Sequence, residues 1–187
     1  MANLDRVNGF SFAKSLTGAP VSALIRQYNV DSSNATAIFL GDAVTLEADG
    51  NITRAATGDT ILGVAVATGV DSVTHNDGVD GYYNADNLSQ RYVPASTAAV
   101  VGVIPAETSL FEIQTETGSG AVVIGELADI VDAGGNTTTG FSGQELEMTA
   151  VNNDCKIVEF VTTADNDVSL ANARVMVKFQ STTNALD

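Results

Sequence analysis

The sequence of 187 residues contains no tryptophan, only one cysteine, one histidine and three prolines. The single cysteine, Cys155, excludes an intramolecular disulfide, so packing, chain pairing or oligomerisation has to hold the fold together. With one cysteine and one distant histidine, His75, a zinc site is not expected. Without tryptophan, the sequence also lacks a residue type that is common in sugar-binding sites.

Basic residues are scarce as well. Eight Lys and Arg stand against 23 Asp and Glu, and the net charge is −15. A free-standing nucleic-acid binder needs a basic face, so we expect no nucleic-acid partner, and an anionic membrane surface is disfavoured for the same reason. The sequence contains no run of 18 or more apolar residues, so we expect no transmembrane helix. The first 15 residues also lack the apolar core of a secretion signal. We expect a protein that stays in a cytoplasm until it joins a larger assembly.

Short runs rich in β-branched and apolar residues are abundant, and 17 glycines provide for tight turns between them. The runs that predict strands are Thr36–Leu40, Ala43–Ala48, Ile52–Ala55, Thr60–Thr68, Gln90–Val93, Ala98–Ile104, Ser109–Thr115, Val122–Ile124, Leu127–Val131, Glu145–Ala150, Lys156–Thr163 and Arg174–Gln180. Strands of this length without a long helix predict an all-β fold, with a β-barrel or a β-tulip or sandwich body.

A long polar stretch at residues 69–89 separates the first strands from the rest. Loops of this length are often functional or lie at an interface. We therefore expect a body of residues 36–187 that can be divided into two β sub-modules near this stretch.

The first 35 residues differ from this body. Residues 1–30 carry Arg6, Lys14 and Arg26 against one acid, Asp5, whereas the rest of the chain is strongly acidic. We expect an extended N-terminal arm, which either folds back on its own body or docks on a partner. In the docking alternative the candidate partner-binding residues are Arg6, Phe10, Phe12, Lys14, Leu24, Arg26 and Tyr28. Deleting residues 1–28 is then expected to leave a folded body that no longer binds.

Within this arm, the apolar residues from Val21 to Tyr28 follow Pro20 at helical spacing, which fits one short helix. The same pattern also fits a strand, so both alternatives stay open here.

Residues able to carry out catalysis are few and scattered. His75 lies in a polar loop, and there is no G-x-S-x-G elbow for a serine nucleophile. The acids of residues 71–86, and the pair Asp165 and Asp167, lack the spacing of a calcium-binding loop. We therefore expect no enzyme, no metal and no cofactor.

Two stretches carry a resemblance to a known family. Met1-Ala2-Asn3, Arg6, Gly9-Phe10, Lys14 and Gly18-Ala19-Pro20 match an N-terminal pattern of small virion proteins of tailed bacteriophages, although Val7 stands where a proline usually follows the arginine. Residues 41–68 are similar to the β-hairpin core of phage head decoration and head-fibre proteins, and residues 137–148 and 165–179 also look like that group.

The chain thus resembles a capsid decoration, or cement, protein of a tailed bacteriophage. The resemblance implies a β subunit, often a homotrimer, that sits on the capsid surface of the virion and stabilises contacts between major capsid proteins. The partners it implies are the major capsid protein and further copies of the chain.

Other functions fit the same features. A tail-tube, head-fibre base or minor capsid protein would have an equally acidic, β-rich sequence. A carbohydrate-binding or adhesin module belongs to a different class, and the absence of tryptophan weighs against it.

Overall fold

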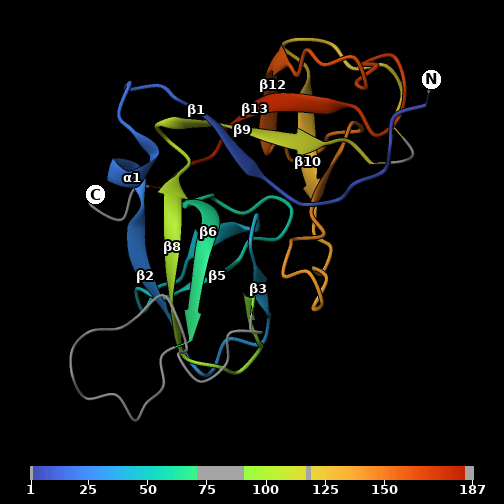
Figure 1. Ribbon diagram of the computed structural model, residues 1–187. Helices are drawn as coiled ribbons and strands as arrows, with labels where there is room; N and C mark the ends of the chain where they lie inside the picture. Colours follow the sequence, from blue (N-terminus) through green and yellow to red (C-terminus); the bar gives the residue numbers. More distant parts are fainter. Residues whose placement is uncertain (1, 71–90, 117–118, 184–187) are drawn as a thin grey trace.

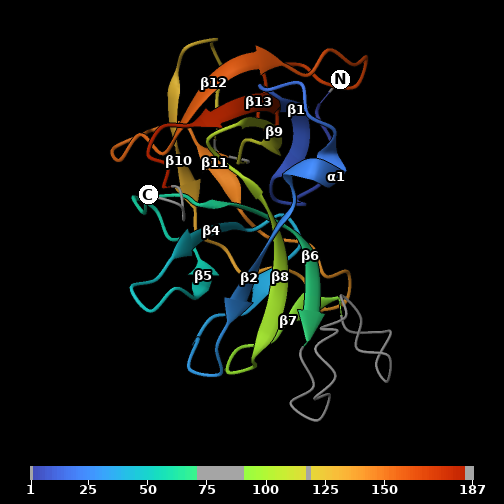
Figure 2. The same ribbon diagram turned by 90° about the vertical axis from the view of Figure 1, so that its left-hand side faces the viewer.

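The computed structural model, shown in Figure 1, describes residues 2–70, 91–116 and 119–183. It confirms the all-β prediction, because the described residues form two antiparallel sheets, a two-stranded ribbon and one short helix. Figures 1 and 2 show the sheets as two lobes, one above the other. Within the described ranges no closed barrel forms.

The upper lobe is a six-stranded sheet. In spatial order its strands are β1 (Ser11–Ser15), β9 (Ser109–Gln114), β13 (Arg174–Phe179), β12 (Cys155–Phe160), β10 (Leu127–Val131) and β11 (Glu145–Glu147). All neighbours are antiparallel.

The lower lobe is a five-stranded antiparallel sheet beside a two-stranded ribbon. In spatial order the sheet contains β2 (Arg26–Val30), β8 (Ala99–Pro105), β6 (Gly63–Val70), β4 (Ala43–Leu46) and β5 (Ile52–Arg54). The ribbon pairs β3 (Ile38–Phe39) with β7 (Tyr92–Val93), and the rings of Phe39 and Tyr92 stack at 4.8 Å.

The N-terminal segment is part of both sheets, which corrects the expectation of an extended arm. It forms β1 at the edge of the six-stranded sheet, then one turn of helix α1 (Val21–Leu24), then β2 at the edge of the five-stranded sheet. Backbone pairing and burial of Phe10 give the segment partners within its own chain. The alternative in which the arm folds back on its body is therefore the one that the structure has.

The lobes also divide the chain differently from the predicted split near residues 69–89. Apart from β1, the six-stranded sheet takes all its strands from residues 109–179, and the five-stranded sheet takes its strands from residues 26–105. After the N-terminal segment, the chain passes from the strands of the lower lobe to those of the upper lobe at the short turn between β8 and β9.

Two apolar cores hold the lobes. The first lies between the sheets and contains Phe10, Phe111 and Phe179, whose ring centroids are 4.9–6.5 Å apart. The second core is made mainly of valine, isoleucine, leucine and alanine, and it lies inside the five-stranded lobe under the β3–β7 ribbon. Successive side chains of β8 point to opposite sides of the sheet and so contribute to both cores. Ile104 faces the first core, and Val101 and Val103 face the second.

A buried glutamine connects the two lobes. Gln144, which precedes β11, is fully buried; its Oε1 accepts a hydrogen bond from the Ala43 N–H at 2.7 Å, and its Nε2 donates to the Ala55 carbonyl at 3.1 Å. Ala43 begins β4 and Ala55 follows β5, so one side chain satisfies two backbone groups of the opposite sheet.

Most predicted strands are present, with one clear exception. A strand is predicted over residues 122–124, but they form none: Val123 and Ile124 are exposed, at a turn that brings the Gly125 N–H to the Ile157 carbonyl at 2.8 Å. The Asp49-Gly50 hairpin is confirmed between β4 and β5, with Gly50 at a φ of 88°.

Candidate functional site

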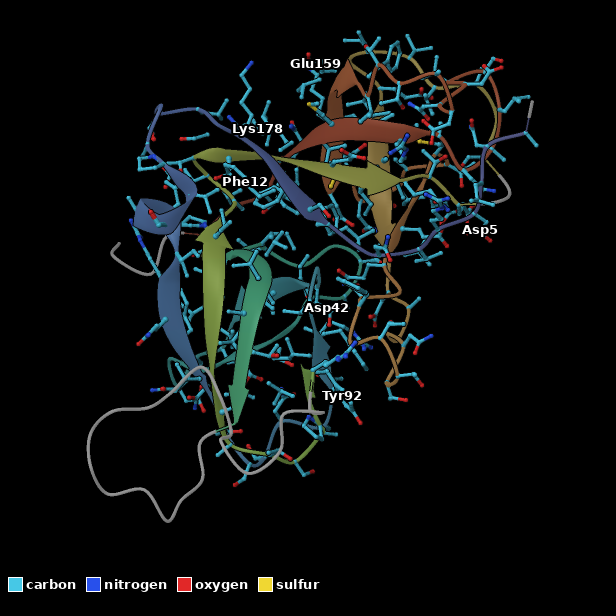
Figure 3. The ribbon with its side chains drawn as sticks, in the orientation of Figure 1. Asp5, Phe12, Asp42, Tyr92, Glu159 and Lys178 are labelled. Atoms are coloured by element: carbon cyan, nitrogen blue, oxygen red, sulfur yellow. The ribbon has the colours of Figure 1, made fainter. Side chains whose placement is uncertain are left out.

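The apolar residues predicted to contact a partner lie inward. Phe10 is 2% exposed and Leu24 is also buried, both in the first core. Phe12 is half-buried with its ring edge-on to Phe111 at 6.5 Å, and it points toward the other sheet in Figure 3. Tyr28 is half-buried against the second core. Phe10 and Leu24 are therefore corrected from partner anchors to core residues.

The three basic residues of the segment are exposed, but they lie in different places. Arg6 lines a polar pocket, Lys14 lies on β1, and Arg26 begins β2 on the other sheet. Between Lys14 and Arg26 the chain exposes Leu16 (49%) and Val21 (41%), neither of which is among the partner-binding residues predicted from the sequence. We call Lys14, Leu16, Val21 and Arg26 the N-terminal strip; exposed apolar side chains flanked by charge are typical of contact surfaces.

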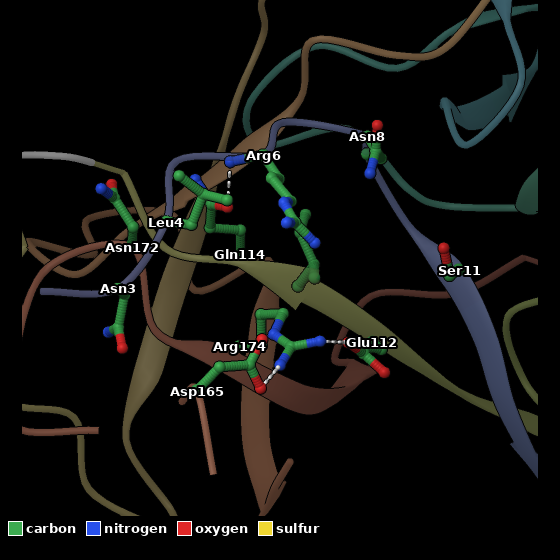
Figure 4. Close-up of a pocket in the computed structure, with 12 residues that line it drawn as sticks. Asn3, Leu4, Arg6, Asn8, Ser11, Glu112, Gln114, Asp165, Asn172 and Arg174 are labelled. Carbon is green, nitrogen blue, oxygen red and sulfur yellow. Dashed lines mark hydrogen bonds and ion pairs between the residues drawn. The ribbon is translucent and has the colours of Figure 1, made fainter. Parts of the chain in front are cut away.

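The polar pocket lies where residues 3–11 cross the strands β9 and β13 (Figure 4). Its volume is about 160 Å³, and its lining includes Arg6, Arg174, Glu112 and Asp165. Arg174 is already engaged, at 2.9 Å from Asp165 and 3.5 Å from Glu112. Its charge is therefore balanced within the pocket, which argues against an anion site.

Hydrogen bonds fasten the N-terminal segment over this pocket. The Asn3 side chain donates to the carbonyls of Asp167 and Ala171 and accepts from the Asp167 N–H, at 2.7–2.9 Å. The Arg6 N–H donates to Oε1 of Gln114 at 2.8 Å, and Nε2 of Gln114 donates to Asp5 at 3.0 Å. The pocket thus lies where the N-terminal segment is hydrogen-bonded to the rest of the six-stranded lobe.

The side chains that line this pocket are suited to hydrogen bonding. Amides, guanidinium groups and paired carboxylates line it, and the residues named for it include no histidine, cysteine or activated hydroxyl. Over the residues that the structure describes, no three His, Cys, Asp or Glu side chains come together as metal ligands. Asp165 and Asp167 accept separate hydrogen bonds, from Arg174 and Ser169.

The acids of residues 71–86 and His75 lie outside the described residues. Cys155 lies in the first core, and burial raises the pKa of its thiol, so the reactive thiolate is disfavoured.

Two buried aspartates have structural partners. Asp42 accepts a hydrogen bond from the Phe39 N–H at 2.7 Å, and burial raises the pKa of its carboxyl to about 6. Burial also works to raise the pKa of Asp129, but hydrogen bonds from the N–H groups of Asn152, Val151 and Asn153 outweigh it and lower that pKa. Both carboxyls hold turns in place.

Comparison with family models, with curated proteins and with solved structures found no match to this chain. In the described part of the chain, no helix has the length and apolar character needed to cross a membrane. The class that the structure itself defines is a two-sheet, all-β protein.

Proposed function

We propose that this protein is a structural component of a tailed-phage virion, without enzymatic activity, that binds the outer surface of the capsid and stabilises contacts between major capsid proteins. The virion assignment is motivated by two resemblances: residues 1–28 resemble small virion proteins of tailed phages, and residues 41–68 resemble phage head decoration and head-fibre proteins. The observation that carries the binding role is the N-terminal strip. Along the sequence it has two exposed apolar side chains between two cations, in a chain whose net charge is −15.

The construction of the fold suits a protein that bears load. One continuous segment supplies an edge strand to each sheet, and a core of phenylalanines lies between the sheets. A ligand that joins neighbouring capsid subunits works best when it is rigid, because little ordering entropy is lost on binding. Many copies on one closed shell then give avidity from modest single contacts.

The proposed role is tested first by composition. We expect gradient-purified particles, assembled from a genome that encodes this chain, to contain it at a fixed ratio to the major capsid protein. Quantitative mass spectrometry of the particles measures this ratio, and its absence from particles would contradict the proposal.

The strip is tested by substitution. Leu16→Ser with Val21→Ser is expected to weaken rebinding to particles lacking the protein by at least tenfold, because apolar contact area is lost. Val151, which is 81% exposed in a different loop, provides the matched control. Equal loss with Val151→Ser would show that the strip has no special role.

Self-association as a homotrimer is a further part of the proposal. Sedimentation at rising concentration, followed by the mass of the protein eluted from particles under mild conditions, measures it. A monomer in both measurements would contradict the trimer.

A further inference from the structure

All three lysines of the chain, Lys14, Lys156 and Lys178, lie in one row across the six-stranded sheet. Lys156 is directly opposite Lys178 on the neighbouring strands β12 and β13. Lys14 on β1 is opposite Leu110 on β9. Leu110 precedes Phe111, and Lys178 follows Val177, in the β9–β13 register. The lysines therefore occupy three of the four neighbouring strands at one level of the sheet.

The row lies on the outer face of the sheet. Phe111 and Val177, next to Leu110 and Lys178, are buried in the first core, so the residues beside them point to the opposite side. All three lysines are exposed. Figure 3 shows Lys178 on the side of the sheet that faces away from the five-stranded lobe. We call Lys14, Lys156 and Lys178 the lysine row.

In the described ranges no salt bridge involves the lysine row. The salt bridges found there involve arginines only, and none of the three ammonium groups lies within 4.0 Å of a carboxylate. Like charges directly opposite on neighbouring strands destabilise a sheet, as at Lys156 and Lys178. Lysine on an edge strand can protect against aggregation, but this explains only Lys14, because β12 and β13 are interior strands.

We propose that the lysine row is a docking surface for an acidic protein surface. It deepens the proposed function, on which it rests, by extending the partner contact from the N-terminal strip across the outer sheet face through Lys14. Neighbouring strands are about 4.8 Å apart, so the row is about 14 Å long. An extended segment with carboxylates at every second residue places three of them over about 13 Å.

Charge favours protein over nucleic acid as the partner. Glu112 and Glu159 lie one level along the sheet from the row, on either side of Met176. A continuous phosphate backbone would meet these carboxylates and a protein of net charge −15, whereas a protein surface can end its acidic patch at the row.

The test in solution uses the full chain and a labelled decapeptide of alternating glutamate and threonine, followed by fluorescence anisotropy. We expect binding at low salt that weakens with added salt. Replacing the three lysines by glutamine should weaken it at least tenfold. The control variant Asn29→Asp, Ser32→Asp and Ala35→Asp changes the net charge equally at exposed positions of the other lobe and should bind within twofold of the parent.

Three solution results would overturn the inference. One is equal binding of the peptide by the lysine-free variant. Another is tighter binding of a ten-nucleotide single-stranded DNA than of the peptide. The third is a salt-sensitive oligomer that disappears in the lysine-free variant, since this would assign the row to a second copy of the chain.

The test on particles separates this inference from the proposed function. Acetylation with an amine-reactive reagent, read by mass spectrometry, should modify the three lysines in the free protein and spare them on the particle. Full reactivity on the particle would overturn the docking surface while leaving the virion role intact. Absence of the protein from particles would overturn the virion role, whereas the peptide assay would still report on the row.

Discussion

The two sheets of this protein differ in what covers their faces. Central strand β8 of the five-stranded sheet is buried on both sides, with Ile104 in the core between the lobes and Val101 and Val103 in the second core. The six-stranded sheet buries one face, whereas its outer face carries the lysine row. Packing therefore constrains both sides of β8 and only one face of the six-stranded sheet. The outer face of the six-stranded sheet is therefore where residues are free to serve binding.

The largest expected effect tests whether both sheets depend on the same N-terminal segment. Deleting residues 1–28 removes β1, most of β2 and Phe10 from the first core. We now expect the remainder to be unfolded, in place of the folded body expected from the sequence. Circular dichroism and urea denaturation measure this, and a cooperative transition at the parent midpoint would contradict it.

A smaller loss of stability is expected from removing the hydrogen bonds that Gln144 makes between the lobes. Gln144→Leu leaves the Ala43 N–H and the Ala55 carbonyl buried without partners, at about 1–3 kcal/mol each. We expect the free energy of unfolding in urea to fall by about 2–6 kcal/mol. Gln180→Leu, at an exposed position after β13, is the control and should change it little. A matching loss in both variants would mean that the buried bridge contributes nothing specific.

The next effect concerns pH and the buried carboxyl of Asp42, beside β4. Its pKa is about 6 in the folded protein, against 3.8 for an aspartate free in water, so folding favours the protonated form. Its contribution to stability is therefore greatest below pH 4 and declines as the pH rises to about 6. Asp42→Asn should raise the free energy of unfolding by about 1–3 kcal/mol at pH 7 and by little at pH 4.

Chemical denaturation of both proteins across this pH range measures the difference. An equal gain at both pH values would show that ionisation of Asp42 is not its cause.

The smallest effect tests the outer face of the six-stranded sheet. Lys156→Gln relieves the repulsion with Lys178 and should stabilise the fold by about 0.2–1 kcal/mol at low salt, with less gain at high salt. Thermal melts at two salt concentrations measure this. A loss of stability would mean that the row supports the fold and that the like charges of Lys156 and Lys178 do not destabilise the sheet.

The sequence predicted most strands of the body because their apolar runs and Gly turns are local signals, as with the Asp49-Gly50 hairpin. It did not predict that β1 and β2 pair with the body. Apolar residues such as Phe10 and Tyr28 give the same sequence pattern whether they pack on their own chain or on a partner. The helical spacing after Pro20 became one turn of α1, after which the chain turns extended at Ile25 and pairs with β8.

The candidate site was less predictable. Lys14, Lys156 and Lys178 are far apart in sequence, and only the register of four strands brings them into one row. Likewise, Leu16 and Val21 are exposed whereas Phe10 and Leu24 are buried, although all four are apolar. Pairing between strands far apart in the sequence decides both the alignment of the lysines and the exposure of these apolar residues. A single sequence carries no signal for that pairing.

A reconstruction of the intact particle by electron microscopy would show which face of this protein meets the capsid. We expect this protein on the outside of the capsid, with the N-terminal strip and the lysine row against an acidic surface of the major capsid protein and the rest of the five-stranded lobe turned away. A particle in which the five-stranded lobe makes the contact while the lysine row faces solvent would contradict it.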